Sequence, residues 1–413
     1  MTNSNMKIKV HRGLEQIGGC ITEISTGASR VFIDMGQNLP GNGEKTTSEQ
    51  DREMVESFFR NNPKEHEAVV YTHAHEDHVG LFSYVPNNVP QYIGEGGKEI
   101  LLAKYDLIKK GHELGGLMTE IIKEDKKKIR KLKTFKTWQR TKPHAKPKSF
   151  NIGDIRITPF FNCHSIYDSY MLLIEADGRR IWHTGDYREH GYMGKGLVPT
   201  LKCYATNIDV LITEGTMLRR DDECIHEREV ARRMASVMDA FKYVVVLASA
   251  TDIERLASIK EASKKARKDL YICGGYMRQT MHIFTRCEAE TSKGLFEFHP
   301  MYVGQRNMYK VPVMRKKGFV LVAGVMQQDF VEELCEDLDP SEVLFIYSAW
   351  DGYYKDPAQV MENPLYKMFR DKFSNVVDIH TSGHADRKTI KKVVETVNPK
   401  EVIVIHKEVD AQL

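Results

Sequence analysis

The sequence lacks the features that mark several large classes of protein. None of its apolar runs is long enough to cross a bilayer, and its first ten residues, MTNSNMKIKV, contain no apolar signal core. Its seven cysteines are odd in number, widely spaced and without a C-x-x-C pair, which argues against a disulfide framework and a cysteine-based zinc site. We therefore expect a cytoplasmic protein that contacts no membrane.

The chain also lacks a strong charge bias, internal repeats and low-complexity linkers. Its net charge is only +3 over 413 residues, so the overall balance points to no particular class of partner. The length is sufficient for two or three domains with real cores.

The pattern of apolar runs changes near residue 215. Before that point, short strands separated by Gly-rich turns dominate. The expected strands are 7–13, 20–25, 30–36, 67–72, 154–161, 170–176, 179–185 and 209–215. After it, buried strands alternate with helices, which is typical of a mostly parallel sheet. These strands are 243–249, 269–275, 318–324 and 341–348.

Three helices can be placed from sequence. A helical stretch is expected at about 97–115. The run TDIE at 251–254 has the form of a capping box, so a second helix should start there. A third, from about Asp386, carries an apolar face (Ile390, Val393, Val394, Val397) and leads into a last strand, 401–406.

The run THAHEDHVG, residues 72–80, is the most informative part of the sequence. It places four ligand-type side chains within six positions: His73, His75, Asp77 and His78. In an extended segment, residues i and i+2 point the same way, so the first two histidines can bind one ion from one side. After a bend, the other two can face a second ion. Imidazole and carboxylate suit zinc and similar divalent ions.

One loop cannot complete two coordination shells, so further ligands should lie at other strand ends. His164, Asp186 and His406 each follow or close an apolar run. An isolated residue of this kind is more often structural than ligating, so these three depend on the cluster at 72–80 for their interpretation.

A second feature is the basic segment, residues 121–150. It contains twelve Lys or Arg residues against Glu124 and Asp125, with Phe135 and Trp138 among them. A solvated, lysine-rich surface is one explanation. A surface that tracks phosphates and stacks bases is the other, and the sequence leaves both open.

The ordered motif set resembles the metallo-β-lactamase superfamily, and its continuation resembles the β-CASP, ribonuclease J-like branch of nucleases. The matching positions are Asp34 in FIDMG, the H-x-H-x-D-H loop, His164 in HSIYDS, Asp186, Glu214 in LITEGT, His384 in HTSGHAD and His406 in NPKEVIVIH. The resemblance implies an α/β fold, an αββα sandwich formed by residues 1–215 and 366–413, interrupted by an inserted α/β (β-CASP) domain at 216–365.

The resemblance also implies two divalent metal ions, zinc or else manganese. One would be held by His73, His75 and His164, and the other by Asp77, His78 and His406, with Asp186 bridging them. Two such ions can activate a water as hydroxide and clamp a phosphodiester in line. Asp77 would also orient that hydroxide, and Asp34 would support the ligand loop.

The remaining motif residues imply roles on the substrate side. His384 is the candidate that protonates the leaving oxygen, and Glu214 would orient it. His380, Ser382 and Ser249 are candidates for binding a substrate phosphate.

The implied function is a metal-dependent ribonuclease; 5′-exonucleolytic action is one option, and the sequence leaves exonucleolytic and endonucleolytic action both open. His406 favours RNA, since DNA-directed relatives tend to carry valine there. The alternatives are a DNA nuclease of the same fold, a small-molecule metallo-hydrolase, and a non-catalytic nucleic-acid-binding subunit. The sequence stops soon after His406, before the C-terminal domain used for assembly in ribonuclease J, so a homodimer stays open.

Overall fold

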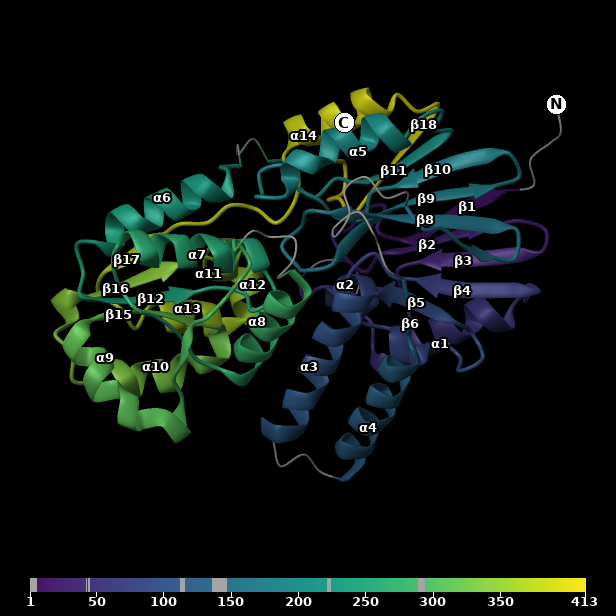
Figure 1. Ribbon diagram of the computed structural model, residues 1–413. Coiled ribbons are helices and arrows are strands. Elements are labelled where there is room, and N and C mark those ends of the chain that lie inside the picture. Colours follow the sequence, from purple (N-terminus) through teal and green to yellow (C-terminus); the bar gives the residue numbers. More distant parts are fainter. Residues whose placement is uncertain are drawn as a thin grey trace. The chain divides into compact units, whose positions relative to one another are not determined.

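A computed structural model describes residues 6–41, 43, 45–111, 116–135, 147–220, 224–288 and 294–413, without the side chains of 108–119 (Figure 1). The chain divides into two compact units. Unit 1 comprises Met1–Glu223 and Gly383–Leu413, and unit 2 comprises Cys224–Ser382.

Unit 1 contains two sheets. The first runs in the order β1-β2-β3-β4-β5-β6, antiparallel from β1 to β3 and parallel from β3 to β6. Its strands are Lys7–Arg12, Ile21–Ser25, Ser29–Ile33, His66–Val70, Gln91–Gly94 and Lys133–Phe135. The parallel arrangement matters for the site, because β3 and β4 end at the same edge of the sheet. Asp34 and the loop that carries His73 follow these strands and therefore lie next to each other.

The second sheet of unit 1 runs in the order β18-β11-β10-β9-β8-β7. Its strands, from β7 to β11 and then β18, are Phe150–Ile152, Ile155–Asn162, Ser169–Ala176, Arg179–His183, Val210–Glu214 and Glu401–Ile405. The last strand pairs in parallel with β11, so the C-terminal segment completes a sheet built from the first half of the chain. His406 therefore ends next to the strand that carries Glu214.

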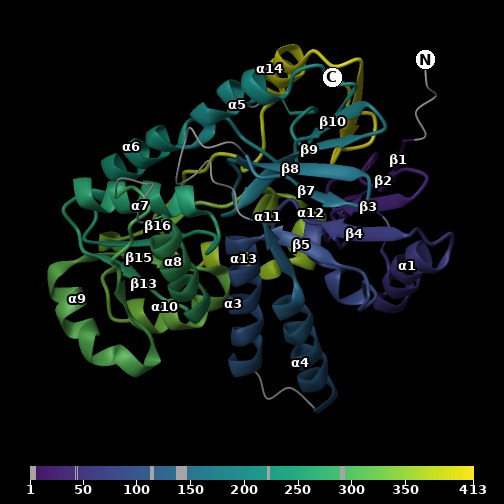
Figure 2. The same ribbon diagram turned by 45° about the vertical axis from the view of Figure 1, so that its right-hand side comes forward.

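The two sheets pack face to face over an apolar core. Alternate residues of both inner faces contribute to it, among them Ile24, Val31, Ile157, Leu172 and Ile212. Helices cover the outer faces, as Figures 1 and 2 show. They are α1 (Ser48–Arg60) on the first sheet, and α5 (Leu197–Tyr204) and α14 (Arg387–Val397) on the second. This is the αββα sandwich that the resemblance implied.

A helical hairpin extends from the first sheet of unit 1 (Figure 2). It consists of α3 (Glu95–Gly111) and α4 (Gly116–Lys131). The basic segment starts in α4, where several lysines have partners within the chain: Lys126 pairs with Asp106, and Lys128 donates to the carbonyl of Ser83.

Phe135, which follows that helix, is 6% exposed. It packs against Phe150 and Tyr170 in the core, so it cannot stack on a base. Trp138 lies outside the described residues.

Unit 2 is a parallel sheet in the order β14-β13-β15-β12-β16-β17. From β12 to β17 its strands are Tyr243–Leu247, Leu270–Ile272, Met301–Tyr302, Phe319–Ala323, Val343–Tyr347 and Val376–Asp378. Its helices are α6 (Glu227–Met238), α7 (Ile253–Lys265), α8 (Gly275–Glu288), α9 (Val311–Lys317), α10 (Gln328–Cys335), α11 (Gly352–Lys355), α12 (Pro357–Glu362) and α13 (Pro364–Arg370).

Two details of unit 2 differ from the sequence-based expectation. The unit continues past residue 365, because β17 pairs with β16 and adds a sixth strand. The N-cap of α7 is Asp252 rather than Thr251, since the Asp252 carboxylate accepts from the Arg255 amide, while Thr251 bonds to Ser249. Aspartate is as good an N-cap as threonine, so the capping pattern was correct in kind and wrong by one residue.

Across the described residues, no helix is long and apolar enough to cross a membrane.

Candidate metal centre

The histidine-rich loop changes direction at His75. The chain is extended at this residue, with φ −71° and ψ 148°, and α2 (Glu76–Val79) begins directly after it. His73 and His75 therefore precede the bend, whereas Asp77 and His78 lie on a helical turn. This is the arrangement that the spacing predicted for two groups of ligands.

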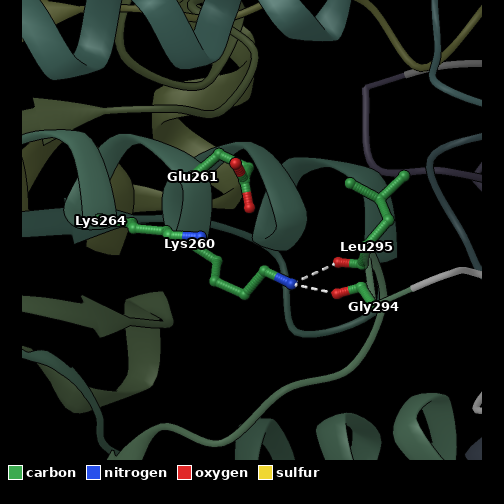
Figure 3. Close-up of a pocket in the computed structure, with 5 residues that line it drawn as sticks. All are labelled: Lys260, Glu261, Lys264, Gly294 and Leu295. Carbon is green, nitrogen blue, oxygen red and sulfur yellow. Dashed lines mark hydrogen bonds between the residues drawn. The ribbon is translucent and has the colours of Figure 1, made fainter.

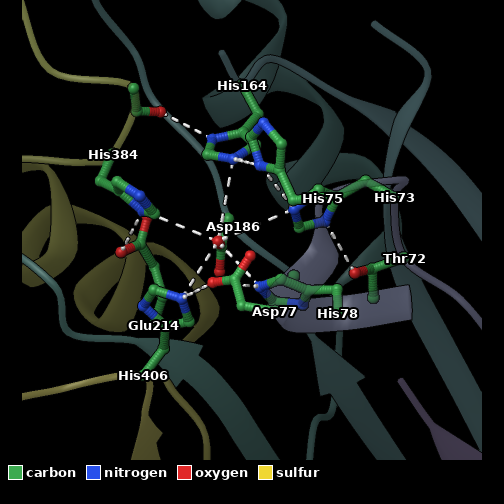
Figure 4. Close-up of polar contacts among 12 residues, drawn as sticks. Thr72, His73, His75, Asp77, His78, His164, Asp186, Glu214, His384 and His406 are labelled. Carbon is green, nitrogen blue, oxygen red and sulfur yellow. Dashed lines mark hydrogen bonds and ion pairs between the residues drawn. The ribbon is translucent and has the colours of Figure 1, made fainter. Parts of the chain in front are cut away.

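Three histidine nitrogens converge on one side of the site (Figure 4). His75 Nδ1 lies 3.2 Å from His73 Nε2 and 3.1 Å from His164 Nε2. Tetrahedral zinc with Zn–N bonds of about 2.0–2.1 Å places its ligand nitrogens about 3.4 Å apart. The three positions therefore fit a single ion.

A second group lies beside the first. His406 Nε2 is 3.0 Å from Asp77 Oδ2, and His78 Nε2 is 3.7 Å from the same oxygen. These side chains come from opposite ends of the chain and from both sheets. All three are buried, and the two histidines are each 1% exposed, so bulk water does not compete with these side chains for a bound ion.

Asp186 lies between the two groups. Its Oδ2 is 3.1 Å from His78 Nε2 and 3.6 Å from His406 Nε2 on one side. On the other side the same oxygen is 3.9 Å from His73 Nε2 and 3.8 Å from His164 Nε2. One carboxylate thus faces both candidate shells.

The histidines are held by partners on the far side of each ring. The Thr72 hydroxyl donates to Asp34, so it accepts from His73 Nδ1. His78 Nδ1 donates to the same Asp34 carboxylate at 2.8 Å. Such outward bonds fix the tautomer and leave Nε2 directed into the site.

The same arrangement recurs for the other two histidines. His164 Nδ1 donates to the Gly383 carbonyl at 2.7 Å. Thr216 Oγ1 donates to the His406 carbonyl and lies 2.8 Å from His406 Nδ1, from which it accepts. Sequence reasoning missed Thr72 and Thr216, and the signal available was only their position, directly before the first histidine and two residues after Glu214.

Asp34 and its neighbours set the position of the ligand loop. Asp34 adopts a left-handed conformation, φ 63°, and its Oδ1 accepts the Thr72 amide at 2.7 Å. A Cβ on Gly36 would lie 1.8 Å from the Asp77 carbonyl oxygen, so only glycine permits this approach. Asp34 therefore supports two ligand histidines without pointing into the site.

The charges of the site favour bound cations. Burial lowers the pKa of His73 and His164 well below the usual range and that of His75 to about 4, so all three are neutral near pH 7. Burial acts against the charged forms of Asp77 and Asp186, but the neighbouring histidines outweigh it and lower the pKa of both carboxyls.

His78 behaves differently from the other histidines. Burial opposes its charge, but the carboxylates of Asp186, Asp77 and Asp34 outweigh burial and raise its pKa well above the usual value. The carboxylates that would hold a proton on Nε2 would equally hold a metal ion there.

Two buried atoms give the clearest test of fit. His78 Nε2 and Asp186 Oδ2 lie 3.1 Å apart and are inaccessible, and within the described part of the chain neither makes a hydrogen bond of normal geometry. An unsatisfied buried polar atom is costly, and here both point into the space shared by the other ligand atoms. A divalent metal ion satisfies them, so the donor set fits metal.

His384 and Glu214 lie at the edge of this centre. Glu214 is 1% exposed and its Oε2 accepts from His384 Nδ1 at 3.1 Å, while Oε1 accepts the amides of Tyr187 and Ala385. Burial lowers the pKa of His384, but the Glu214 and Asp186 charges outweigh it and raise the pKa to about 8. Its side chain is 22% exposed, so solvent reaches this ring.

The residues predicted to bind a substrate phosphate lie in unit 2. Ser249 is exposed in the turn before α7, where its hydroxyl bonds to Thr251. His380 and Ser382 follow β17, and His380 Nδ1 accepts from Arg255 at 2.9 Å, which places the ring proton on Nε2. Their role in phosphate binding stays a prediction.

A separate hollow of about 500 Å³ lies in unit 2, lined by Lys260, Glu261, Lys264, Gly294 and Leu295 (Figure 3). Lys260 Nζ donates to the carbonyls of Gly294 and Leu295, both at 2.7 Å, and to that of Glu297. Its ammonium is used to fix this loop. None of the predicted site residues lines the hollow.

Two family models match the chain. A beta-lactamase superfamily domain matches residues 47–246, and a Zn-dependent metallo-hydrolase RNA specificity domain matches residues 373–413. The second match contains His384 and His406, and the first contains the loop at 72–80 with His164 and Asp186.

Curated relatives are similar over most of this chain. Ribonuclease J of Helicobacter pylori strain 26695 is 22% identical over 98% of it, and ribonuclease J of Sinorhizobium meliloti is 21% identical over 85%. An RNase J-like protein of Methanocaldococcus jannaschii is 27% identical over 51%. The alignments cover only 57%, 59% and 42% of those relatives.

A solved structure has the same fold. It is a protein of unknown function from Enterococcus faecalis V583, with a TM-score of 0.69 and 18% identity, matching 97% of this chain and 94% of its own. Fold, site geometry and family matches agree: the chain belongs to the metallo-β-lactamase superfamily, in its β-CASP, ribonuclease J-like branch.

Proposed function

We propose that this protein is a metal-dependent ribonuclease that hydrolyses RNA phosphodiesters, with 5′-exonucleolytic action as the mode to be tested. The observation that carries the proposal is the convergence of His73, His75 and His164 on one side of Asp186, and of Asp77, His78 and His406 on the other. The similarity to proteins named ribonuclease J and the match to an RNA specificity domain support RNA as the substrate class.

We assign two divalent ions, zinc or manganese, to this centre. Bound there, they would activate a water near neutral pH and neutralise charge on the phosphodiester. The three-nitrogen group favours a borderline ion such as zinc, whereas the shell with two carboxylates is also suited to manganese.

The protein's own groups would orient the reactants around that chemistry. Asp77 Oδ2, which faces His78 and His406, would accept a hydrogen bond from the attacking water and fix its direction. As the phosphorus–oxygen bond breaks, His384 would give a proton to the departing oxygen. Glu214 would keep the His384 ring in place through Nδ1 and favour its charged form.

The phosphate-binding residues His380, Ser382 and Ser249 complete the proposal on the substrate side. All seven cysteines are free, which fits a reducing compartment, and we place the enzyme in the cytoplasm.

The test is a time course on end-labelled RNA and DNA of the same sequence, with 5′-phosphate, 5′-triphosphate or 5′-hydroxyl ends. The protein is reconstituted with zinc or manganese, and Asp186→Asn is the matched control for a contaminating nuclease. We expect cleavage of RNA with mononucleotides released first from 5′-phosphorylated ends. Internal fragments would mean endonucleolytic action, preferential cleavage of DNA would favour the DNA nuclease, and equal activity in the control would remove the proposal.

A further inference from the structure

A buried ion pair in unit 2 lies outside the metal centre. Arg255, in the first turn of α7, is 1% exposed, and Glu227, in the first turn of α6, is 0% exposed. Arg255 Nη2 lies 2.9 Å from Glu227 Oε1, and Nε lies 3.2 Å from both carboxylate oxygens. Burying such a pair gains little stability over apolar residues of the same size, so its other contacts are informative.

The remaining Arg255 donors bind a segment that returns from the end of unit 2. Nη1 donates to His380 Nδ1 at 2.9 Å, and Nη2 donates to the Thr381 carbonyl at 3.0 Å. Nη1 also donates to Ser348 Oγ at 2.7 Å, and that hydroxyl donates in turn to the Ile379 carbonyl at 2.7 Å. Arg255 thus fixes three consecutive residues, His380 and Thr381 directly and Ile379 through Ser348. We call residues 379–382 the strap.

The chain beyond the strap enters the metal centre at once. The Gly383 carbonyl accepts from His164 Nδ1, and Glu214 binds the His384 ring and the Ala385 amide. A Cβ on Gly383 would lie 2.1 Å from Ser165 Oγ, so the backbone has little room to shift. Only Ser382 separates the residue held by Arg255 from the residue held by His164.

We propose that Arg255 is a positioning residue for the reaction. By fixing the strap, it sets the register in which Gly383 orients the His164 ring and in which His384 is presented to the substrate. The Glu227 carboxylate compensates the buried charge and orients the guanidinium fork, which no lysine could replace in all its bonds. The kinetic part of this inference rests on the proposed function, whereas its structural part does not.

The test compares three variants with the metal-loaded full chain. Arg255→Met/Glu227→Met removes both charges together, which avoids leaving Glu227 buried without a partner. Arg255→Lys keeps the charge and loses the fork. Lys265→Met is the matched control, because Lys265 lies exposed at the end of the same helix and its replacement also exchanges a positive charge for methionine. For each we measure melting temperature, bound metal, kcat and KM on RNA, and amide hydrogen exchange of peptides covering residues 376–386.

We expect the double variant to melt near the wild-type temperature and to retain metal. Its exchange over residues 380–385 should be at least about 10-fold faster, and kcat should fall at least about 10-fold with little change in KM, because a small misplacement of reacting groups is costly. The exchange rate and kcat of Arg255→Lys should lie between those of the double variant and those of the wild type. The Lys265→Met control should match the wild type in all four readouts.

Two results would overturn the inference: unchanged exchange over 380–385 in the double variant, or a kcat loss without faster exchange there. If the double variant does not fold, Arg255→Lys decides by the same readouts. If the wild-type chain has no nuclease activity, the proposed function fails while the exchange data still decide whether Arg255 fixes the strap.

Discussion

At the scale of single residues, the direction in which each histidine donates its ring N–H determines what it can do. Four histidines direct Nδ1 to a partner outside the centre and Nε2 into it: His73, His78, His164 and His406. His384 gives Nδ1 to the buried carboxylate of Glu214, as His78 does to that of Asp34. What distinguishes His384 is its access to solvent, since its side chain is 22% exposed whereas that of His78 is 1% exposed, so it can exchange a proton with a substrate at the edge of the centre.

The first prediction follows from that distinction. His384→Ala should leave metal content and melting temperature nearly unchanged, since the shells on either side of Asp186 remain complete. The rate should fall by about 10²–10⁴-fold, the usual scale for a general acid, with a smaller change in KM. Metal analysis together with kcat and KM on RNA checks this, and the deficit should shrink on a substrate with a better leaving group.

Glu214→Gln provides the comparison for this prediction. Its loss should be of the same kind and smaller, and the double variant should be little worse than His384→Ala, because the two residues act as a unit. Losses that multiply, or a metal ion missing from His384→Ala, would mean that His384 belongs to the coordination shell or to substrate binding.

Sequence reasoning identified ligand-type residues better than the residues that support them. Histidine and aspartate at strand ends are conspicuous in a sequence, whereas Thr72 and Thr216 are ordinary threonines until the fold places them behind a histidine. The left-handed backbone conformation of Asp34 and His406 could not be predicted from the sequence either, because it depends on the hydrogen bonds of neighbouring loops rather than on local propensity.

At the scale of secondary-structure elements, long apolar strands and the amphipathic α14 were predictable, and short edge strands were not. β6, β7, β14 and β17 have only two or three residues each, too few to show a period. The apolar face expected on α14 is present, with Ile390, Val393 and Val397 buried and Asp386 as the N-cap. The missed β17 is why unit 2 extends beyond the expected boundary.

The basic segment gives the second prediction. Arg130, Lys131 and Lys133 are exposed at the end of α4 and in β6, whereas other lysines of this helix are paired within the chain. If the segment tracks a phosphate backbone, replacing these three by glutamine should weaken RNA binding. The slope of log affinity against log salt should fall by about 0.7 per lost contact with single-stranded RNA.

The matched control for the basic segment is Lys123→Gln/Lys127→Gln. These lysines lie on the same helix but pair with Glu120 and Glu124 at i,i+3, so a carboxylate already competes with phosphate for each of them. We measure binding over a salt series for both sets. An unchanged slope in the triple variant would leave the segment as a solvated surface.

At the scale of the whole molecule, the candidate centre gathers residues that are far apart in sequence. His73 and His406 come from opposite ends of the chain, and they meet because β18 joins the second sheet next to β11 while β3 and β4 end together in the first. No local pattern could show this meeting. The ordered motifs implied it only through resemblance, and the sandwich then supplied the physical reason.

The central claim is that this centre holds two metal ions bridged by Asp186. Elemental analysis of protein purified without chelator, then reconstituted with zinc or manganese and desalted, tests it directly. We predict two ions per wild-type chain, and fewer than one for Asp186→Asn, which loses activity with the metal because the bridging charge is gone. Fewer than one ion per wild-type chain after reconstitution, with no rescue of activity, would contradict the account.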